Sequence, residues 1–279
     1  MENRNIGFIG AGKMGSALIK GIIKAGIVKH ENIGASDVYE PFLRDLQAKM
    51  GIMVSSDNVV IAQKSDILIL AVKPDTLESV LADLRDYITS DKLVISIAAG
   101  VPLFTYEHAL LKGTRIIRVM PNIAATVLEA ASGIALGKNA TPEDLKITLE
   151  IFSAVGTAVQ VPESLMDTVT GLSGSGPAFI FPVIEAMADG AVFEGMDRKS
   201  AQTLAAQTVL GAAKMVLETG LHPGELKDMV TSPGGTTIQG IHSLEEAGIR
   251  AAFMNVVIRA SERSKEIREN KSSKELRGD

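Results

Sequence analysis

The sequence contains no cysteine, no tryptophan and only four histidines, His30, His108, His222 and His242. Without cysteine the chain can form neither a disulfide framework nor a thiolate metal site. The histidines are scattered along the chain without the spacing of metal ligands, so we expect no metal.

Long hydrophobic runs and clusters of positive charge are also missing. The sequence has no unbroken run of about eighteen apolar residues, so we expect no segment that spans a bilayer. The net charge is −5 and no Lys/Arg cluster falls on one identifiable face, which argues against nucleic acid as a partner. The opening residues MENRN lead directly into an apolar run, a pattern that predicts no signal peptide. Together these absences predict a soluble, cytoplasmic protein.

The first half of the sequence alternates short apolar runs with helical patterns. We expect helices at residues 14–26, 41–50, 76–87, 102–110 and 142–153. We expect strands at Ile6–Ile9, Ile33–Asp37, Ile67–Val72, Val94–Ile97, Arg115–Val119 and Thr157–Val161. This alternation is typical of an α/β fold with a doubly wound, mostly parallel sheet. Because 279 residues accommodate two domains, we predict a Rossmann-like domain over residues 1–161.

The character of the chain changes after Val161, where no further strand pattern occurs. Residues 201–217 carry a single charge, on Lys214. A helix that is apolar nearly all round must be buried, and a small domain has little room to bury several. We therefore predict an all-α dimerisation domain over residues 162–279, packed against a second copy in an obligate homodimer. We expect the charged tail, residues 261–279, to be a solvated helix that ends in disorder.

A glycine-rich segment, GAGKMG, follows the first predicted strand and opens the first predicted helix. Gly10, Gly12 and Gly15 have the G-x-G-x-x-G spacing of a dinucleotide-binding turn. In such a turn the first glycine permits the sharp bend, the second admits the pyrophosphate, and the third allows helix and strand to pack closely. The helix N-terminus supplies free N–H groups for the phosphates. We predict binding of a dinucleotide.

The end of the second strand leaves the choice between NADH and NADPH open. Asp37 follows Gly15 at about the distance expected of a carboxylate that binds the adenosine ribose, which favours NADH. Ser36 precedes it, however, and a hydroxyl there can also receive a 2′-phosphate. Asp37 can alternatively cap the next turn.

Three further segments end predicted parallel strands: LAVKP at 70–74, ISIAAG at 95–100 and VMPN at 119–122. Ligands of an open α/β sheet bind at such ends. Lys73 is a candidate catalytic acid, and its alternatives are a solvated lysine or a phosphate contact, because a lysine must be strongly desolvated to donate near neutral pH.

A second glycine-rich loop, TSPGGTTIQG at 231–240, opens an amphipathic helix near the end of the chain. The N–H groups of Gly235, Thr236 and Thr237 form a suitable site for a carboxylate, and the Ser232 hydroxyl can donate to the same anion. The alternative is an ordinary N-cap, in which Ser232 or Thr236 caps the next turn.

These motifs, in this order and spacing, resemble those of the pyrroline-5-carboxylate reductases. GAGKMG, LAVKP, SIAAGV, RVMPN, GLSGSGPAF, GAAKM and HPGELKDMVTSPGGTTIQGIHSLEE carry the resemblance, which runs from residue 6 to about residue 260. The family reduces 1-pyrroline-5-carboxylate to L-proline with NADPH or NADH, in the last step of proline biosynthesis. Its members are homodimers, often assembled into larger rings.

The resemblance also implies roles for individual residues. Thr237 would contact the substrate nitrogen, with Ser232 and Lys73 as the other candidate catalytic groups. Substrate contacts would come from Ser175, Ser232, Gly234, Gly235, Thr236 and Thr237. Coenzyme contacts would come from Gly10, Gly12, Lys13, Met14, Gly15, Ser36, Asp37, Asn58, Ala71, Val72, Lys73, Pro74, Ala98, Met120, Pro121 and Asn122. A threonine hydroxyl does not titrate near neutral pH, so we expect positioning and electrostatics to dominate catalysis.

Two other functions compete with this one. A β-hydroxyacid dehydrogenase also joins a Rossmann domain to a helical domain, but its lysine and asparagine positions hold Ile180 and Ile184 here, and isoleucine cannot act as a general base. A non-catalytic nucleotide-binding protein would need no second anion site such as residues 231–240.

Overall fold

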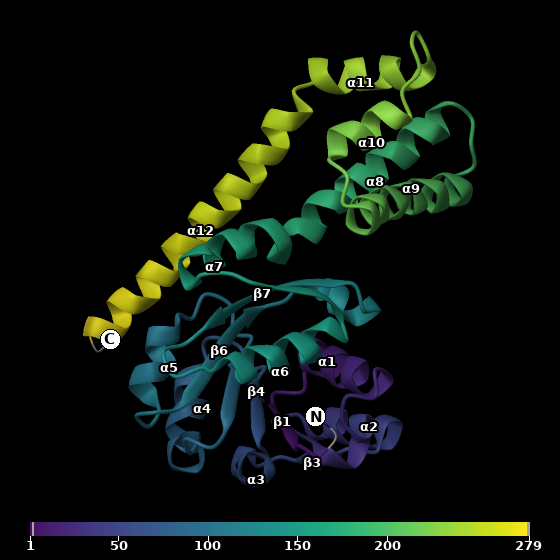
Figure 1. Cartoon of the computed structure of the whole chain (residues 1–279). Helices are drawn as coiled ribbons and strands as arrows, with labels where there is room; N and C mark the ends of the chain where they lie inside the picture. The colour runs from purple at the N-terminus through teal and green to yellow at the C-terminus, as the bar shows by residue number, and fades with distance from the viewer. Residues whose placement is uncertain (2, 278–279) are drawn as a thin grey trace. The chain divides into compact units, whose positions relative to one another are not determined.

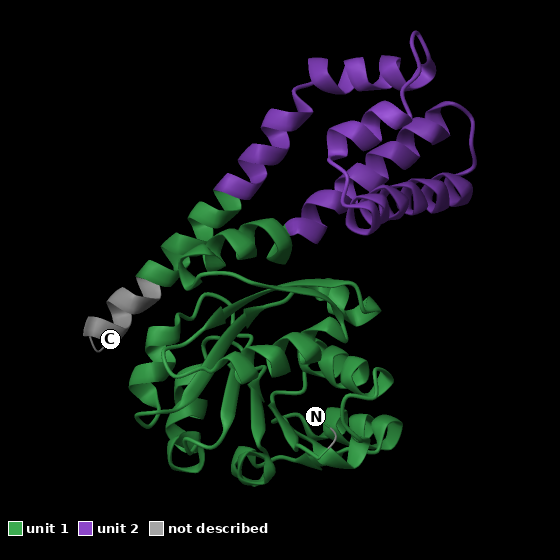
Figure 2. Ribbon diagram, viewed as in Figure 1, with its two compact units in different colours: residues 1–175, 259–279 green, residues 176–258 purple. Residues whose placement is uncertain are grey.

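A computed structural model describes the backbone of residues 1 and 3–277, with side chains up to Glu269. The chain forms two compact units (Figure 2). Unit 1 comprises residues 1–175 together with the chain from Arg259 onward, and unit 2 comprises Gly176–Ile258. The predicted boundary after Val161 falls inside unit 1, and the division into functional domains at that point stays a prediction.

Unit 1 is built on an eight-stranded sheet with the order β3-β2-β1-β4-β5-β6-β7-β8. All neighbouring strands are parallel except β6 and β7, which are antiparallel. The doubly wound, mostly parallel α/β fold is therefore confirmed. The strands are β1 (Ile6–Ile9), β2 (Ile33–Ser36), β3 (Met53–Ser55), β4 (Ile67–Leu70), β5 (Leu93–Ser96), β6 (Arg115–Met120), β7 (Ala130–Leu136) and β8 (Gly156–Gln160).

Helices cover both faces of this sheet (Figure 1). One hydrophobic core joins the sheet to α1 (Lys13–Lys24), α2 (Glu40–Met50) and α6 (Pro142–Ser153). A second core joins the opposite face to α3 (Asn58–Lys64), α4 (Leu77–Leu84) and α5 (Leu103–Ala109). Along β4, Ile67 and Ile69 enter the first core while Leu68 and Leu70 enter the second. A strand buried on both faces has no polar side to alternate with, which is why ILIL is continuously apolar.

Two strands and one helix of unit 1 were not expected from the sequence. β3 has three residues, and α3 follows it directly as a helix of seven. β7 has the sequence AASGIAL, whose first four residues are small and carry no β-branched side chain. Such segments have little strand propensity of their own, and β7 is formed through its pairing with β6 and β8 on either side.

Unit 2 is helical, and among the described residues no strand occurs after Gln160. Its helices are α8 (Gly176–Phe193), α9 (Arg198–Thr219), α10 (Pro223–Met229), α11 (Thr236–Glu246) and the first part of α12 (Ile249–Arg277).

The buried core of unit 2 is small. Its buried cluster consists of Ala188, Ala201 and Ala205, and Leu226 in α10 is buried outside this cluster, in the part of the chain that the structure describes. The large apolar side chains lie outside this core: Phe193 is 89% exposed and Leu217 is 74% exposed in the single chain. The expectation that α9 is buried is therefore not met within one copy. Ile184 and Val192 pack against the alanine cluster and are only partly buried, so most of the large apolar surface of unit 2 stays exposed in the single chain.

The helical stretch Glu163–Phe193 is long and apolar enough to cross a membrane by length and composition, whereas the sequence was expected to hold no such segment. Only 6% of its most apolar window is buried in the single chain. It includes a π-helical turn at Thr170–Gly174 and Pro182 inside α8. Length and composition do not distinguish such a helix from one that packs against another chain.

The part of α12 that belongs to unit 1 packs against the rest of that unit through a buried carboxylate. Asp167, in α7 (Met166–Val169), accepts a hydrogen bond from Ser264 Oγ at 2.7 Å and one from Arg268 Nε at 3.0 Å. Ser261 and Ser264 are both buried. The expectation of a fully solvated tail helix is therefore wrong, because one polar face of the helix meets Asp167. The expected disorder at the end of the tail lies outside the residues that the structure describes in full.

Candidate active site

The glycine-rich turn joins β1 to α1 at the carboxyl edge of the sheet. Gly10 has φ of +93°, and a Cβ there would lie 2.7 Å from the Ala71 carbonyl oxygen. A Cβ on Gly15 would lie 2.5 Å from the Gly10 carbonyl oxygen, whereas one on Gly12 would meet no described atom within 4 Å. Gly10 and Gly15 are thus required by the fold, while Gly12 leaves its outer side open.

This open side suits a pyrophosphate. Gly12 is the N-cap of α1, and among the described residues no side chain caps the helix. The N–H groups of the first turn are therefore available to an anion, and the helix dipole favours negative charge there. β1 and β4 are sheet neighbours whose following helices lie on opposite faces, so the turn lies at the topological switch point where doubly wound folds bind dinucleotides.

Three predicted coenzyme residues meet next to this turn, at the end of β2. Asp37 Oδ2 accepts a hydrogen bond from the Ala11 N–H at 2.9 Å, which ties β2 to the glycine-rich turn. The Ser36 hydroxyl donates to Asn58 Oδ1 at 2.8 Å. Ser36 itself is fully buried, so its hydroxyl orients the Asn58 amide and does not face an open surface.

The end of β5 is held by a hydrogen-bonded pair that the sequence did not reveal. Ser96 Oγ and Tyr106 Oη lie 2.5 Å apart in the core, and Ser96 Oγ also accepts a hydrogen bond from the Ala98 N–H at 3.3 Å. Burial raises the pKa of the Tyr106 phenol well above its usual range, so the group stays neutral. The pair fixes the backbone at Ala98, one of the predicted coenzyme contacts. A serine and a tyrosine ten residues apart carry no motif by which they could have been found.

The ends of β4 and β6 hold the other predicted coenzyme residues. The Ala71 N–H donates to the Ile9 carbonyl at 2.8 Å, which places residues 71–74 beside the glycine-rich turn. Lys73 is exposed in this segment. After β6, the Asn122 side chain donates to the Ser173 carbonyl at 3.0 Å and accepts from the Ala124 N–H at 3.2 Å. Asn122 therefore joins the VMPN segment to the π-helical turn.

A cavity of about 280 Å³ lies beside the loop after β5. Its lining includes Ala99, Gly100, Thr170, Ser175 and Arg263, all in unit 1. Ser175, a predicted substrate contact, is thus brought next to the loop that contains Ala98.

The second glycine-rich loop lies in unit 2 and leads into α11. Gly234 has φ of +69°, a conformation that favours glycine, and a Cβ on Gly235 would displace the Ser232 hydroxyl and lie 3.3 Å from the Ser232 carbonyl oxygen. Gly235 is the N-cap of α11, and no described side chain caps this helix. The alternative of a serine or threonine N-cap is therefore excluded for the described structure. The expectation of a free Gly235 N–H is wrong, because this group donates to the Ser232 carbonyl at 3.1 Å. The N–H groups of Thr236 and Thr237 are left for an anion.

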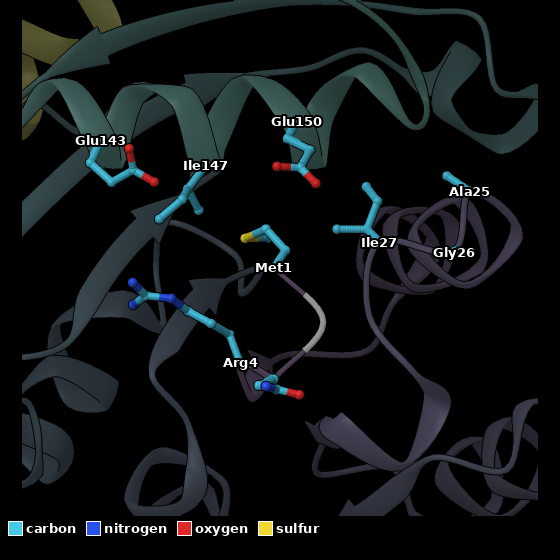
Figure 3. A pocket seen from close by; sticks show the side chains of 9 residues that line it. Met1, Arg4, Ala25, Gly26, Ile27, Glu143, Ile147 and Glu150 are labelled. Atoms are coloured by element: carbon cyan, nitrogen blue, oxygen red, sulfur yellow. The ribbon is translucent and has the colours of Figure 1, made fainter.

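A larger cavity, of about 740 Å³, lies elsewhere in unit 1 (Figure 3). Its lining comes from residues before β1, including Arg4, from the end of α1 and from the acidic face of α6 at Glu143 and Glu150. This is the amino-end side of β1, whereas the glycine-rich turn follows its carboxyl end. A choice of site by cavity volume would therefore have favoured this cavity over the glycine-rich turn. No group of three His, Asp or Glu side chains among the described residues could hold a metal ion.

The fold and the glycine-rich turn together define the class of protein: a Rossmann-like, dinucleotide-binding domain joined to a helical domain. The predicted coenzyme residues gather at one edge of unit 1, and residues Ser232 to Thr237 lie together in unit 2.

Comparison with known proteins narrows this class. Residues 163–267 match the family described as pyrroline-5-carboxylate reductase dimerisation, and residues 5–100 match the one described as NADP oxidoreductase, coenzyme F420-dependent. A pyrroline-5-carboxylate reductase from Methanosarcina acetivorans is 85% identical over 96% of this chain and 99% of its own. The structure of a pyrroline-5-carboxylate reductase from Coxiella burnetii superimposes with a TM-score of 0.91 at 36% identity, over 95% of this chain and 99% of its own. The structure of the Plasmodium falciparum pyrroline carboxylate reductase with NADP bound superimposes with a TM-score of 0.84 at 35% identity, over 96% of this chain and 99% of its own.

This chain belongs to the pyrroline-5-carboxylate reductase family. The resemblance noted in its motifs is confirmed. A prephenate dehydrogenase from Aquifex aeolicus, at 16% identity and a TM-score of 0.53, shares the fold alone.

Replacing Gly12 by alanine should remove coenzyme binding and leave the fold in place. The new methyl group would fill the space of the pyrophosphate, so we expect the Kd for coenzyme to rise at least about tenfold. Because that methyl group meets no described atom, the free energy of unfolding should fall by no more than about 1 kcal/mol, the cost of alanine at an N-cap. Calorimetric titration with coenzyme and chemical denaturation measure the two quantities.

Gly15→Ala is the matched contrast to this variant. Its Cβ would press on the Gly10 carbonyl oxygen, so it should lower the free energy of unfolding by about 2 kcal/mol. A Gly12→Ala protein that binds coenzyme like the parent would contradict the assignment of this turn.

Proposed function

We propose that this chain reduces 1-pyrroline-5-carboxylate to L-proline by hydride transfer from NADPH or NADH, in the last step of proline biosynthesis. The observation that carries the proposal is the 85% identity to a pyrroline-5-carboxylate reductase over nearly the whole of both chains. The chain is an oxidoreductase of that family, and its coenzyme is a nicotinamide dinucleotide. A bound coenzyme supplies the hydride that reaches C5 of the cyclic imine.

The protein's part is to hold the coenzyme and to orient the imine. The uncapped N-terminus of α1 and the open side of Gly12 support pyrophosphate binding. Asn58 and Asp37 would bind the adenosine ribose, and the backbone held by Ser96 at Ala98 would flank the nicotinamide. We propose that the other residues given by the family resemblance also contact the coenzyme.

The loop before α11 would hold the substrate. Its ring carboxylate would accept hydrogen bonds from the N–H groups at the start of the helix and from the Ser232 hydroxyl, because an anion is stabilised at an uncapped helix N-terminus. The Thr237 hydroxyl would contact the imine nitrogen. The reaction requires this loop, from the same copy or from a second one, to approach the coenzyme crevice.

The proton on the product nitrogen would arrive with the substrate. An imine that binds in its protonated form needs only the hydride to become the secondary amine, so no strong side-chain acid is required. Lys73 was the candidate acid, and its exposed position provides none of the desolvation that a lysine donor needs. The rate enhancement would then come from orientation and from fixed dipoles.

The β-hydroxyacid dehydrogenase alternative finds no support. Ile180 and Ile184, at the positions where that chemistry needs lysine and asparagine, lie within the apolar helix α8. A site without a titratable group there cannot take the proton from an alcohol.

We further propose that the protein is an obligate homodimer in the cytoplasm, with dimers able to assemble into a larger ring. The match to the dimerisation family over residues 163–267 and the small alanine cluster of unit 2 support a dimer. The apolar stretch Glu163–Phe193 falls within the same residues, which favours a partner helix as its neighbour over a lipid bilayer. We propose neither nucleic acid nor membrane as a partner.

The first test of the function is an assay with each coenzyme in turn. Purified protein should oxidise NADPH or NADH only when pyrroline-5-carboxylate is present, because hydride transfer needs both reactants in place. Loss of the absorbance of the reduced nicotinamide measures the rate. If neither coenzyme is consumed in the presence of the imine, the proposed reaction is wrong.

Thr237→Ala should lower kcat/KM for the imine by about 10- to 100-fold, the loss of one hydrogen bond to a charged group. Its coenzyme affinity should stay within about twofold, because the residue belongs to the substrate loop. Thr237→Ser keeps the hydroxyl and should retain most of the activity. Loss of coenzyme binding in the alanine variant would show that the loop serves the coenzyme.

The thermal unfolding midpoint should rise with protein concentration. In an obligate dimer unfolding is coupled to dissociation, so mass action stabilises the folded state as concentration increases. Differential scanning calorimetry over a hundredfold concentration range measures the shift, and sedimentation velocity gives the subunit count. A monomer with a midpoint independent of concentration would refute the obligate dimer.

A further inference from the structure

We propose that this chain uses NADH in preference to NADPH and that the Asp37 carboxylate makes the choice. The inference rests on the proposed use of a nicotinamide coenzyme at the crevice of unit 1. The two coenzymes differ only by a phosphate on the 2′-hydroxyl of the adenosine ribose. The side chains at the end of β2, where that ribose would lie, therefore decide between them.

Asp37 is fixed in place by two backbone groups. Its Oδ2 accepts from the Ala11 N–H at 2.9 Å and its Oδ1 accepts from the Tyr39 N–H at 3.0 Å. To turn away, the carboxylate would have to give up both hydrogen bonds, and one of them braces the glycine-rich turn. A carboxylate can accept further hydrogen bonds from a ribose hydroxyl. A phosphate brings only acceptors and negative charge, which Asp37 repels.

The hydroxyl that could have received a phosphate is withdrawn from the crevice. Ser36 is 0% exposed, and its hydroxyl donates to Asn58 Oδ1. With Oδ1 occupied, the Asn58 amide nitrogen is the group that can donate to a ribose oxygen. Asp37 as acceptor and Asn58 as donor match a diol, whose hydroxyls both donate and accept.

The surroundings add negative charge at the same place. Residues 36–43 contain no lysine or arginine, and Arg44 lies 3.7 Å from the carboxylate of Glu40. Asp57 caps α3 by accepting from the Val59 N–H at 2.8 Å, which places a second carboxylate beside Asn58. Arginine is a common partner of a 2′-phosphate, and residues 36–43 offer none.

The decisive experiment uses coenzyme fragments without the nicotinamide. Calorimetric titration of the full-length protein with ADP-ribose and with its 2′-phosphorylated form needs neither the imine nor turnover. We expect the unphosphorylated fragment to bind at least about tenfold more tightly. The ratio should shrink as salt is raised, because the discrimination is electrostatic. A parent protein that binds the phosphorylated fragment equally well or better overturns the proposal.

Asp37→Asn tests the residue itself. Asparagine keeps the shape and an acceptor for the Ala11 N–H but removes the charge. The variant should bind the phosphorylated fragment about tenfold more tightly than the parent does, and its kcat/KM with NADPH relative to NADH should rise by a similar factor. Glu40→Gln is the matched control, because it removes a charge from the same segment without touching the glycine-rich turn. In Glu40→Gln the ratio of kcat/KM with NADPH to kcat/KM with NADH should change by less than twofold.

Two results would overturn the role of Asp37. One is a ratio of kcat/KM with NADPH to kcat/KM with NADH that is unchanged in Asp37→Asn, and the other is a change of this ratio in Glu40→Gln as large as that in Asp37→Asn. Asp37→Ser is a second variant if the asparagine protein does not fold, and the titrations of the parent stand without either. A protein that discriminates between the fragments as expected but does not turn over the imine would refute the proposed function and leave this inference standing.

Discussion

The close approach of two backbone segments at the edge of the sheet governs the organisation of unit 1. The turn after β1 lies so near the Ala71 carbonyl that only a residue without Cβ fits at Gly10, and α1 lies so near that turn that the same holds at Gly15. These contacts hold the N-terminus of α1 beside the carboxyl ends of β1 and β4. They also bring the Ala11 N–H within reach of Asp37, so one turn fixes both the segment proposed to bind the pyrophosphate and the carboxylate proposed to bind the ribose.

The packing of unit 2 differs from that of unit 1. Its helices are long and apolar, yet its own core contains three alanines among the described residues. Small side chains let helices approach closely but bury little surface. Unit 1 is therefore packed through contacts within one chain, whereas unit 2 leaves large apolar side chains exposed in the single chain. The family match over residues 163–267 agrees with that division.

The order of the elements could be predicted from the sequence wherever a segment carried its own signal. The strand at Ile6–Ile9 and the helix at residues 142–153 agree with the structure residue for residue. β7 could not be predicted, because AASGIAL becomes a strand only through its neighbours. Within the site, the glycine spacing predicted the turn. The hydrogen bond between the buried Ser36 and Asn58 could not be predicted, because it joins side chains 22 residues apart in the sequence. No local pattern encodes such a pairing.

The return of α12 to Asp167 makes unit 2 an insertion within unit 1. The carboxylate of Asp167 is synthesised 97 residues before Ser264, its hydrogen-bond partner. A growing chain that has completed the sheet therefore still holds an acidic group whose burial must wait, since a buried carboxylate without partners is strongly unfavourable. Unit 1 reaches its final packing only after nearly the whole polypeptide has left the ribosome. The last contacts of unit 1 therefore form only after the helices of unit 2 have been synthesised.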